Sequence, residues 1–569
     1  MDETPQGLRI PEGRVAKPRQ SVSILLTRDG KNGVEVLLAH RIPTLRAFAD
    51  FWSLPGGGIK DFDHNIGNKL ASLENVENEW KGIMAAILRE TAEEVGLAIG
   101  ESSVERVSMR LRHSIIENPE EWINAVDSNQ IPASSNMISH IGTRTTPPFA
   151  PLRFCNRFMH AHMPPGSPEP ELLDVGSEFD ELVWMSADDA IETWESGNML
   201  TAPPIVTLLR DFAESLKNNQ QKISAAINEL SSDPPSGEHR IELAPGIECV
   251  PIRTQTLPPA THTNCFILGE RGGDRIVIDP AAKTDHELEY LQRRIKAVVE
   301  DGGNILATIF THKHQDHIGD LSRISKMYSA PIWCAKETFE VIPNFDTNRI
   351  LKDGDILTLK GPSGNKDWKV YITPGHCPGH ICLASDDYVI SGDLAVMVGT
   401  ILVPSSDGNM DDYIESLRRI NALESSMLFP AHGPFTHRPA KLLNRYITHR
   451  EGRHARVLEA LNQGMNNIEE IANQIPTILE KNFIEFNNSK SAFKLGFWFE
   501  NFSPEIDYEQ SYLWYSVSVS GGIYKAMKLR DRVGEQIEAE KIVELQTEAE
   551  EIFTKNKYFN EGEKTEGDI

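Results

Sequence analysis

The sequence has no uninterrupted apolar run of about 18 residues, the length that a membrane-spanning helix requires. Its first residues, 1–5, are polar and lack the apolar core of a signal peptide. Cysteine is scarce, with 6 in 569 residues, and no two cysteines form a C-x-x-C pair. We therefore expect free thiols in a reducing cytoplasm and no membrane partner.

Positive charge is also in short supply. The chain carries 57 Lys and Arg against 83 Asp and Glu, which gives a formal net charge of -26. Such a field repels nucleic acid, so the composition slightly favours small-molecule substrates over RNA. At 569 residues the chain is too long for one hydrophobic core and predicts several domains.

What the chain does have is a short run of metal-binding side chains at 311–317, T-H-K-H-Q-D-H. Its His312, His314, Asp316 and His317 are the imidazole and carboxylate ligands that zinc-like metals prefer. Side chains two apart in extended backbone point the same way, so the first two histidines can reach one metal while the other pair turns toward a second point. A solvated polar loop is the alternative, and four ligand types at this spacing disfavour it.

Three later loops supply further ligands, each after an apolar strand-like run. T-P-G-H-C-P-G-H contains His376, S-G-D contains Asp393, and A-H-G contains His432. Functional side chains tend to lie on such loops. The first loop also holds His380, which fits a supporting, substrate-contacting or structural role equally, and Cys377, which we interpret as structural. Neither is included in the ligand set.

Together, H-x-H-x-D-H, T-P-G-H, S-G-D and A-H-G resemble the metallo-β-lactamase fold superfamily over about residues 240–455. The resemblance implies an αβ/βα sandwich that binds two Zn2+ or similar divalent ions. It implies a first site of His312, His314 and His376, a second of Asp316, His317 and His432, and Asp393 as the bridge between them.

Two such ions about 3.5 Å apart share one water and lower its pKa to about 7. The resulting hydroxide would attack an ester, thioester or phosphodiester, with Asp316 as a catalytic residue that orients it. Segments 413–417 and 446–450 resemble the β-lactamase-like protein 2 group, some of whose members are endoribonucleases with a small winged-helix-like extension. Thioesters, RNA and other phosphodiesters, and other small esters therefore stay open as substrates.

A second candidate site lies upstream at 89–97. There Glu90, Glu93 and Glu94 fall at i, i+3 and i+4 of an expected helix, so the three carboxylates share one face and repel. A hard cation such as Mg2+ or Mn2+ between them offsets that repulsion. A solvated acidic face is the commoner explanation, but the glycine loop at 55–58 and the adjacent arginine favour a site.

R-E-T-A-E-E-V-G-L at 89–97, with the preceding L-P-G-G, resembles a Nudix box. Nudix enzymes hydrolyse nucleoside diphosphates linked to another moiety. The resemblance implies an α/β/α sandwich, catalytic Glu93 and Glu94 that hold Mg2+ or Mn2+, assistance from Glu90, and an arginine, Arg89, that orients them.

One position departs from this box, because Lys81 stands where a further glutamate is expected. Two hypotheses follow. In the first, both halves are hydrolases and the chain is bifunctional. In the second, the Nudix-like half only senses a nucleotide and the second half is an endoribonuclease. T-T-P-P at 145–148 and T-A-P-P at 201–204 resemble the coenzyme A diphosphatase branch, which implies nucleotide or coenzyme A derivatives as substrates. Glu178, Asp180 or Glu181 would supply a distal acid.

The whole chain is predicted to be α/β with a small helical, winged-helix-like C-terminal extension. Helices of that extension are expected at 454–460, 468–473 and 520–533, and the oligomeric state stays open. The predicted segments are a mobile N-terminus at 1–18, a Nudix-like domain at 19–230, a linker at 231–240, a metallo-β-lactamase-like domain at 241–455, the extension at 456–534 and an acidic tail at 535–569.

Overall fold

The computed structural model divides into two compact units, Met1–Ile447 and Thr448–Ile569. No helix in the described part of the chain is both long and apolar enough to cross a membrane. The residues described are 15–45, 48–236, 240–342, 347–462, 480, 483, 489–501 and 506–562.

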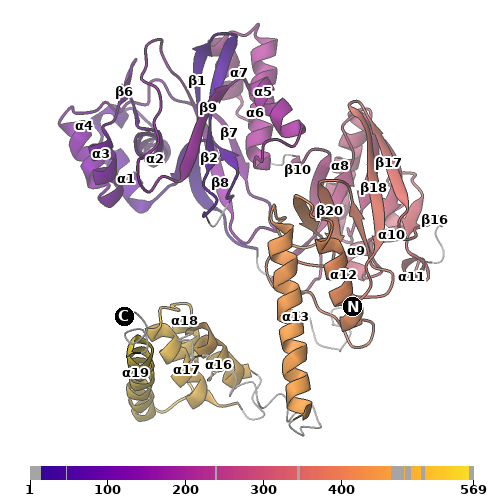
Figure 1. Ribbon diagram of the computed structural model, residues 1–569. Helices are drawn as coiled ribbons and strands as arrows, with labels where there is room; N and C mark the ends of the chain where they lie inside the picture. The colour runs from indigo at the N-terminus through magenta and orange to yellow at the C-terminus, as the bar shows by residue number, and fades with distance from the viewer. Residues whose placement is uncertain are drawn as a thin grey trace, which may run out of the picture. The chain divides into compact units, whose positions relative to one another are not determined.

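The first sheet of the larger unit has seven strands in the order β3-β2-β1-β8-β7, with β4 on β1 and β9 on β2 (Figure 1). Strands β1 and β8 pair in parallel, and the other pairs are antiparallel. The strands are β1 (Arg19–Gly30), β2 (Gly33–Arg41), β3 (Trp52–Ser53), β4 (Gly56–Gly58), β7 (Ser139–Thr145), β8 (Phe154–His162) and β9 (Phe179–Met185).

Helices cover both faces of this sheet. Side chains alternate along a strand, so the consecutive apolar residues of β1 bury opposite faces. Ile24 packs into a core with α2 (Asn78–Val95), whereas Leu25 packs into a second core with α6 (Pro203–Asn218). This layering is that of the expected α/β/α sandwich. Its other elements are α1 (Asp61–Lys69), β5 (Leu97–Ile99), β6 (Val104–Arg106), α3 (Met109–Glu117), α4 (Glu120–Asp127), α5 (Ala187–Glu195) and α7 (Ile223–Ser232).

The second half of the larger unit contains two sheets, of seven and five described strands, each in sequence order. The first sheet is β10 (Ile241–Ala244), β11 (Ile247–Arg253), β12 (His262–Leu268), β13 (Asp274–Ile278), β14 (Asn304–Ile309), β15 (Ile332–Cys334) and β16 (Thr347–Ile350). The second is β17 (Ile356–Gly361), β18 (Gly364–Ile372), β19 (Ile381–Ala384), β20 (Tyr388–Gly392) and β21 (Met427–Pro430).

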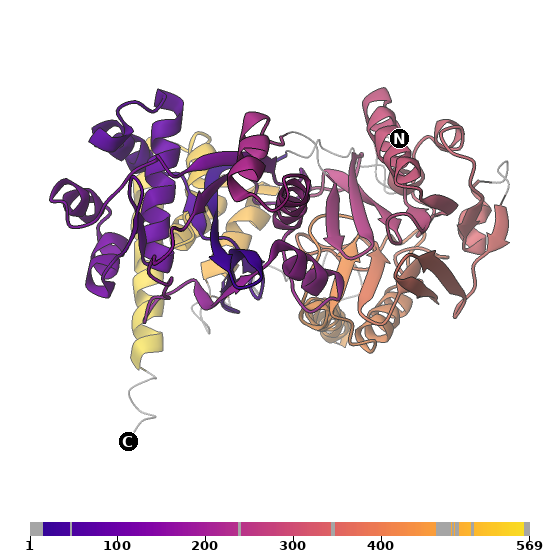
Figure 2. The ribbon, with the colours of Figure 1, turned by 90° about the horizontal axis from the view of Figure 1, so that it is seen from above.

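These two sheets pack against each other, and their helices lie on the outer sides (Figure 2). Phe266 of one sheet and Phe429 of the other meet in the shared core with ring centroids 6.2 Å apart. Helix α8 (Asp285–Glu300) covers the first sheet and α12 (Met410–Asn421) covers the second. The predicted αβ/βα sandwich is therefore confirmed. Its short helices are α9 (Gln315–Ile318), α10 (Leu321–Ile324) and α11 (Lys336–Phe339).

The smaller unit is helical throughout its described residues, which contain no strand that could form a wing. Its core includes Tyr512, Trp514 and Tyr515. Helix α13 (Pro439–Asn462) includes the expected helix at 454–460, and the one expected at 468–473 lies outside the described residues. Residues 520–533 prove to hold the end of one helix and most of another. The other helices of the unit that the structure describes are α16 (Ser489–Asn501), α17 (Tyr508–Ser520), α18 (Ala526–Gly534) and α19 (Ala539–Gly562).

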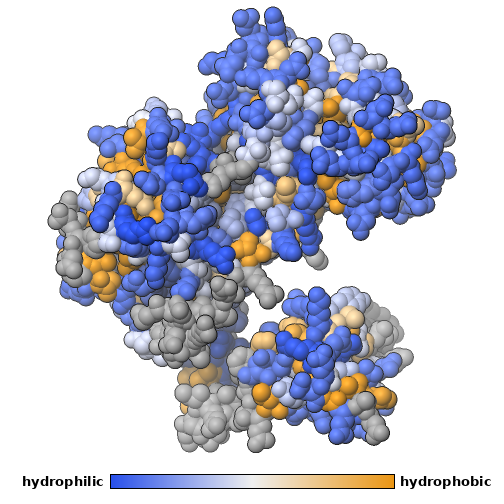
Figure 3. Space-filling model, turned by 180° about the vertical axis from the view of Figure 1, so that it is seen from behind, coloured by the Kyte–Doolittle hydropathy of each residue, from blue (hydrophilic) through white to orange (hydrophobic). Residues whose placement is uncertain are grey.

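Figure 3 shows one face of the molecule, coloured by hydropathy. Hydrophilic residues cover most of the face drawn in Figure 3, where hydrophobic residues form small separate patches. Single exposed apolar side chains of this kind are normal for a folded protein.

Candidate metal centre

Four strand ends bring the candidate ligands of the second half together. The run 311–317 follows β14, and α9 begins directly after His314. His376 follows β18, Asp393 follows β20, and His432 follows β21. The loops that follow these strands of the two packed sheets thus lie together at one edge of the sandwich.

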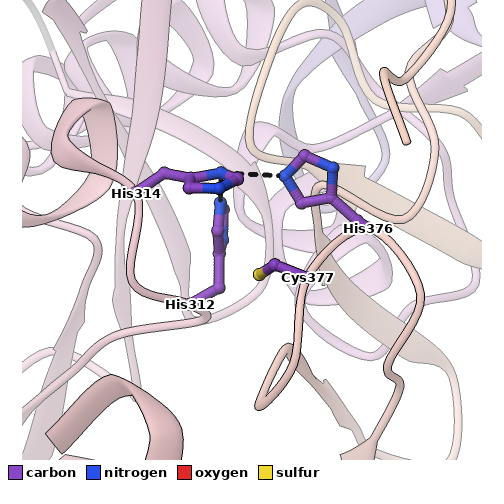
Figure 4. A group of neighbouring side chains, drawn as sticks. All are labelled: His312, His314, His376 and Cys377. Atoms are coloured by element: carbon purple, nitrogen blue, oxygen red, sulfur yellow. Dashed lines mark hydrogen bonds between the residues drawn. The ribbon is translucent and has the colours of Figure 1, made fainter. Parts of the chain in front are cut away.

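Three imidazoles converge on one point in the first of two clusters (Figure 4). Nδ1 of His314 lies 3.0 Å from Nε2 of His312 and 3.0 Å from Nε2 of His376. The neighbouring Cys377 is within ligand reach of all three. Burial raises the pKa of the Cys377 thiol to about 12.

The second cluster joins His317, His432 and Asp316. Asp393 lies between the clusters and offers one carboxylate oxygen to each. Its Oδ2 is 3.5 Å from Nε2 of His376, and its Oδ1 is 3.3 Å from Nε2 of His432 and 3.7 Å from Nε2 of His317. The structure therefore brings all seven sequence-predicted side chains into one centre, with the aspartate in a bridging position.

Four of the imidazoles are oriented by a partner on the ring nitrogen that faces away from the centre. Such partners fix the tautomer and leave the inward nitrogen with its lone pair free for a metal. Nδ1 of each ring contacts an oxygen: Thr311 Oγ1 for His312 (3.0 Å), Asp279 Oδ2 for His317 (2.9 Å), the Leu402 carbonyl for His376 (2.7 Å) and the His262 carbonyl for His432 (2.9 Å).

The inward-facing atoms fit a cation. Among the described residues, Nε2 of His317 and Oδ1 of Asp393 are buried polar atoms without a hydrogen-bond partner. Leaving such atoms unpaired costs about 1–3 kcal/mol each, so native proteins rarely tolerate them without an ion or water. Imidazole nitrogens with shared carboxylates are a donor set typical of zinc. The residues present therefore suit two divalent ions.

The electrostatics of the centre agree with this donor set. Burial lowers the pKa of His312 well below its usual value, and burial together with His376 lowers that of His314 to about 4. Both imidazoles are thus neutral, as metal binding requires. Burial opposes ionisation of Asp393, but the surrounding histidines, His432 first, hold its pKa well below the usual range.

The sequence interpretation missed one supporting residue, Asp279, and left the role of another, His380, open. Asp279 accepts hydrogen bonds from Thr311 N–H (2.8 Å), the Thr311 hydroxyl (2.6 Å) and His317 Nδ1 (2.9 Å). Nε2 of His380 accepts from the backbone N–H of Asp393 at 3.0 Å, which assigns this histidine a supporting role. A Cβ on Gly392 would lie 2.6 Å from that nitrogen, so a glycine is required there. The only sequence signal for Asp279 was its place at the end of a strand.

The glutamates of the first half lie on α2, as predicted. Gly57 packs so closely on this helix that a Cβ would meet the Glu90 carboxylate at 2.5 Å, and Gly56 N–H donates to Glu94 at 2.7 Å. Arg89 is buried and contacts both Glu90 (2.8 Å) and Glu93 (2.9 Å). The glycine loop and the arginine therefore position the acidic face.

A further acid of this network was missed. Asp63 of α1 is fully buried and binds Arg89 through both carboxylate oxygens, at 2.9 and 3.2 Å. Helix α1 thus supplies a carboxylate to the arginine, although Lys81 stands at the box position expected to hold one. The sequence offered one indication of this role, the position of Asp63 six residues after Gly57. The insertion in which Asp63 lies obscured that indication.

The three glutamates do not converge as the histidines do. None of the described groups of three ligand atoms within 4.8 Å of one another includes Glu90, Glu93 or Glu94. Burial raises the pKa of Glu90, and burial together with Glu90 raises that of Glu94 well above its usual value. Glu178, one of the expected distal acids, is close enough to raise the Glu94 pKa further.

Known proteins match the second half most clearly. The family model described as "Metallo-beta-lactamase superfamily" matches residues 258–432. Hydroxyacylglutathione hydrolase of Klebsiella pneumoniae is 27% identical over 179 residues, 31% of this chain and 64% of the relative. The beta-lactamase-like protein 2 homolog of Caenorhabditis elegans is 26% identical over 208 residues, 35% of this chain and 66% of the relative.

A third relative is the atrochrysone carboxyl ACP thioesterase of Aspergillus fumigatus, 25% identical over 201 residues, 35% of this chain and 59% of the relative. The chain thus spans less than two thirds of the length of these relatives. Two of the three carry the names of hydrolases of thioester-type substrates. The matched residues fall within the part of the chain, about residues 240–455, for which a resemblance to this superfamily was predicted.

Two solved structures are each similar to part of the chain. A NUDIX hydrolase from Alicyclobacillus acidocaldarius is 23% identical with a TM-score of 0.32, covering 40% of this chain and all of that one. A metallo-beta-lactamase family protein from Thermus thermophilus is 19% identical with a TM-score of 0.33, covering 40% of this chain and 84% of that one.

Proposed function

We propose that the second half is a dinuclear metallohydrolase that cleaves a carboxylic thioester or ester. The observation that carries the proposal is the convergence of seven ligand side chains on two adjacent points, with Asp393 between them. Thioester hydrolysis is also the activity that the names of the Klebsiella and Aspergillus relatives point to.

Each part of the centre has a task in this reaction. When bound, two divalent ions would polarise the scissile carbonyl and lower the pKa of water. Asp316 and Asp393 line the pocket above the centre, where a carboxylate can hold a water by hydrogen bonds for attack. Asp279, Thr311 and His380 keep the ligands in place, because they bind the outward nitrogens or the backbone. No side-chain nucleophile is required.

The test is hydrolysis by the full chain, stripped of metal and reloaded with Zn2+. Acyl-coenzyme A, acyl-glutathione and single-stranded RNA are offered to wild type and to Asp316→Ala. We expect thioester cleavage that falls at least about 100-fold in the variant. A matched control is Asp386→Ala, an exposed aspartate in the turn between β19 and β20, which should keep full activity. RNA cleavage that requires Asp316, without thioester cleavage, would replace this proposal by the endoribonuclease hypothesis.

For the first half we propose hydrolysis of a nucleoside diphosphate derivative such as coenzyme A, assisted by Mg2+ or Mn2+. The observation in its favour is the Asp63, Arg89, Glu90 and Glu93 network against the glycine loop. Glu93 and Glu94 would be its catalytic residues, and the cation would draw their side chains together. A carboxylate triad supplies hard oxygen ligands, which suit these ions.

Its test is Mg2+-dependent cleavage of coenzyme A and of ADP-ribose by wild type, Glu93→Gln and Glu105→Gln. Glu105 is an exposed residue of β6 and serves as the control. Turnover that is lost only in Glu93→Gln supports catalysis by this half. Binding of either nucleotide without turnover would favour the sensing hypothesis.

A further inference from the structure

A pocket of about 790 Å3 opens above the metal centre, and both halves of the larger unit build its walls. Asp316, His376, Asp393 and His432 lie at its floor. The sides come from two loops of the second half, at 255–261 and 396–407. The remaining wall belongs to the first half and consists of Pro148–Pro151 and Ala16.

The larger part of this wall, Pro148–Pro151, is the tip of the hairpin between β7 and β8 (Figure 1). Its base is closed by backbone bonding, since Thr146 N–H donates to the Phe154 carbonyl at 2.9 Å. Arg153 ties the tip down by donating to the carbonyls of Thr146 and Ala16, each at 2.9 Å. These hydrogen bonds hold the hairpin tip in a defined position in the pocket wall.

Phe149 anchors this tip in the second half. Its side chain packs against the core between the two sheets of the metallo-β-lactamase-type fold while it also lines the pocket. Opposite it stand apolar side chains of the second half, among them Leu257, Val396 and Val398. An apolar group that enters the pocket and reaches its floor would contact apolar side chains of both halves. Its surface would be removed from water, which is favourable by the hydrophobic effect.

The side chains that line the pocket disfavour an anionic occupant such as RNA or a charged thiol carrier. None of the described residues that line the pocket is lysine or arginine. Recognition of phosphates or carboxylates depends on such cations. Asp407 also lines the wall and forms an ion pair with Lys313 at 3.0 Å, so the charge of this nearby lysine is already neutralised. Apart from the metal ions that the floor would hold, a charged thiol carrier or an RNA strand would find no cationic side chain among the described residues of these walls.

We infer that this pocket binds the apolar acyl group of the substrate, and that Phe149 of the first half is a specificity-determining residue for the reaction of the second half. The inference rests on the proposed thioesterase function. It implies that the chain prefers substrates with uncharged aliphatic or aromatic acyl groups, and that the charged carrier of such a substrate lies outside the pocket. The two halves then form one substrate site, so the second half alone has an incomplete wall.

The activity test uses N-acetylcysteamine thioesters, which share one uncharged leaving group, with acetyl to octanoyl chains. Each buried methylene contributes up to about fourfold in affinity. We expect kcat/KM of the zinc-loaded full chain to rise at least about tenfold from butanoyl to octanoyl. In Phe149→Ala the octanoyl to acetyl ratio of kcat/KM should fall about three- to tenfold.

Two further variants keep the test decisive. Leu152→Ala removes an exposed apolar side chain of the same hairpin that does not line the pocket, and should leave the ratio unchanged. Val398→Asp places a carboxylate in the opposite wall at a position that is 40% exposed, so the fold should tolerate it. Its octanoyl to acetyl ratio should fall at least about tenfold. Equal ratios in wild type, Phe149→Ala and Val398→Asp would overturn the inference.

A binding measurement separates the inference from the function on which it rests. Octanamide and acetamide, both neutral, are titrated calorimetrically into the metal-stripped full chain. We expect octanamide to bind wild type and to bind Phe149→Ala at least about threefold more weakly. If octanamide binds in this way but no thioester is cleaved, the proposed function fails and the acyl pocket stands. If neither amide binds wild type, the acyl pocket is overturned.

Discussion

The Asp279 carboxylate accepts a hydrogen bond of 2.9 Å from Nδ1 of His317, a buried imidazole whose Nε2 has no partner among the described residues. This contact fixes the tautomer in which the second nitrogen faces the metal centre. Burial alone would lower the pKa of His317, but the carboxylates of Asp279, Asp393 and Asp316 raise it well above its usual value. The same carboxylates that would attract a proton attract a divalent ion.

Asp279→Asn should weaken metal binding without unfolding the sheet. The amide keeps the size of the carboxylate but loses its charge, and such outer partners typically contribute about 10–100-fold to metal affinity. Competition with a chromogenic chelator measures the effect on the tighter and the weaker ion. The control is Asp274→Asn at the start of the same strand, away from the ligands, which should bind both ions as wild type does. Equal affinities in both variants would contradict the role of Asp279.

Arg89 should matter more for stability than Asp63. Asp63→Ala still leaves the guanidinium paired with Glu90 and Glu93, so the loss should be about 1–3 kcal/mol. Arg89→Met leaves three carboxylates without their cation, for which about 3–5 kcal/mol is expected. The free energy of opening, from hydrogen exchange of the α2 amides, measures both.

Asp61→Asn provides the control for this pair, because Asp61 lies on the same helix turn but is exposed. Its α2 amides should exchange as in wild type. Equal protection in Asp63→Ala and wild type would show that the buried pair does not hold α2 to the inserted helix.

His160 should make the first sheet sensitive to acid. Burial, and then the charge of His162, lowers the pKa of His160 to about 3, while the unfolded chain has the ordinary value of 6.5. Between these values the unfolded state binds more protons, so stability is full above about pH 6.5 and falls as the pH drops toward 3. The slope for one proton is about 1.4 kcal/mol per pH unit.

His160→Gln removes this titration. Hydrogen exchange of the β1 and β8 amides measures the free energy of opening in the variant and in wild type. As the pH falls from 5.5 to 4.5, we expect the wild type to lose about 1.4 kcal/mol of this free energy relative to the variant. A difference that stays constant over this range would mean that His160 is charged within the fold.

The grouping of the seven candidate ligands could be predicted from the sequence because each is a metal-binding residue type that follows shortly after an apolar strand. The layers could be predicted for a similar reason, since runs such as Ile24 to Leu26 bury both faces of a sheet. The role of Asp63 could not be predicted, because Asp63 lies in an insertion far from Arg89 in the sequence and meets it only in the folded chain. Phe149 could not either, because its role depends on how the two halves pack. The predicted domain limits stay predictions.

The central measurement is thioester hydrolysis by the full chain as Zn2+ is added back to metal-stripped protein. The dinuclear centre predicts no turnover without metal and saturation near about two ions per chain. It also predicts a loss of at least about 100-fold in Asp393→Asn, with Glu93→Gln as active as wild type. Full activity in the stripped protein, or in Asp393→Asn, would contradict the account.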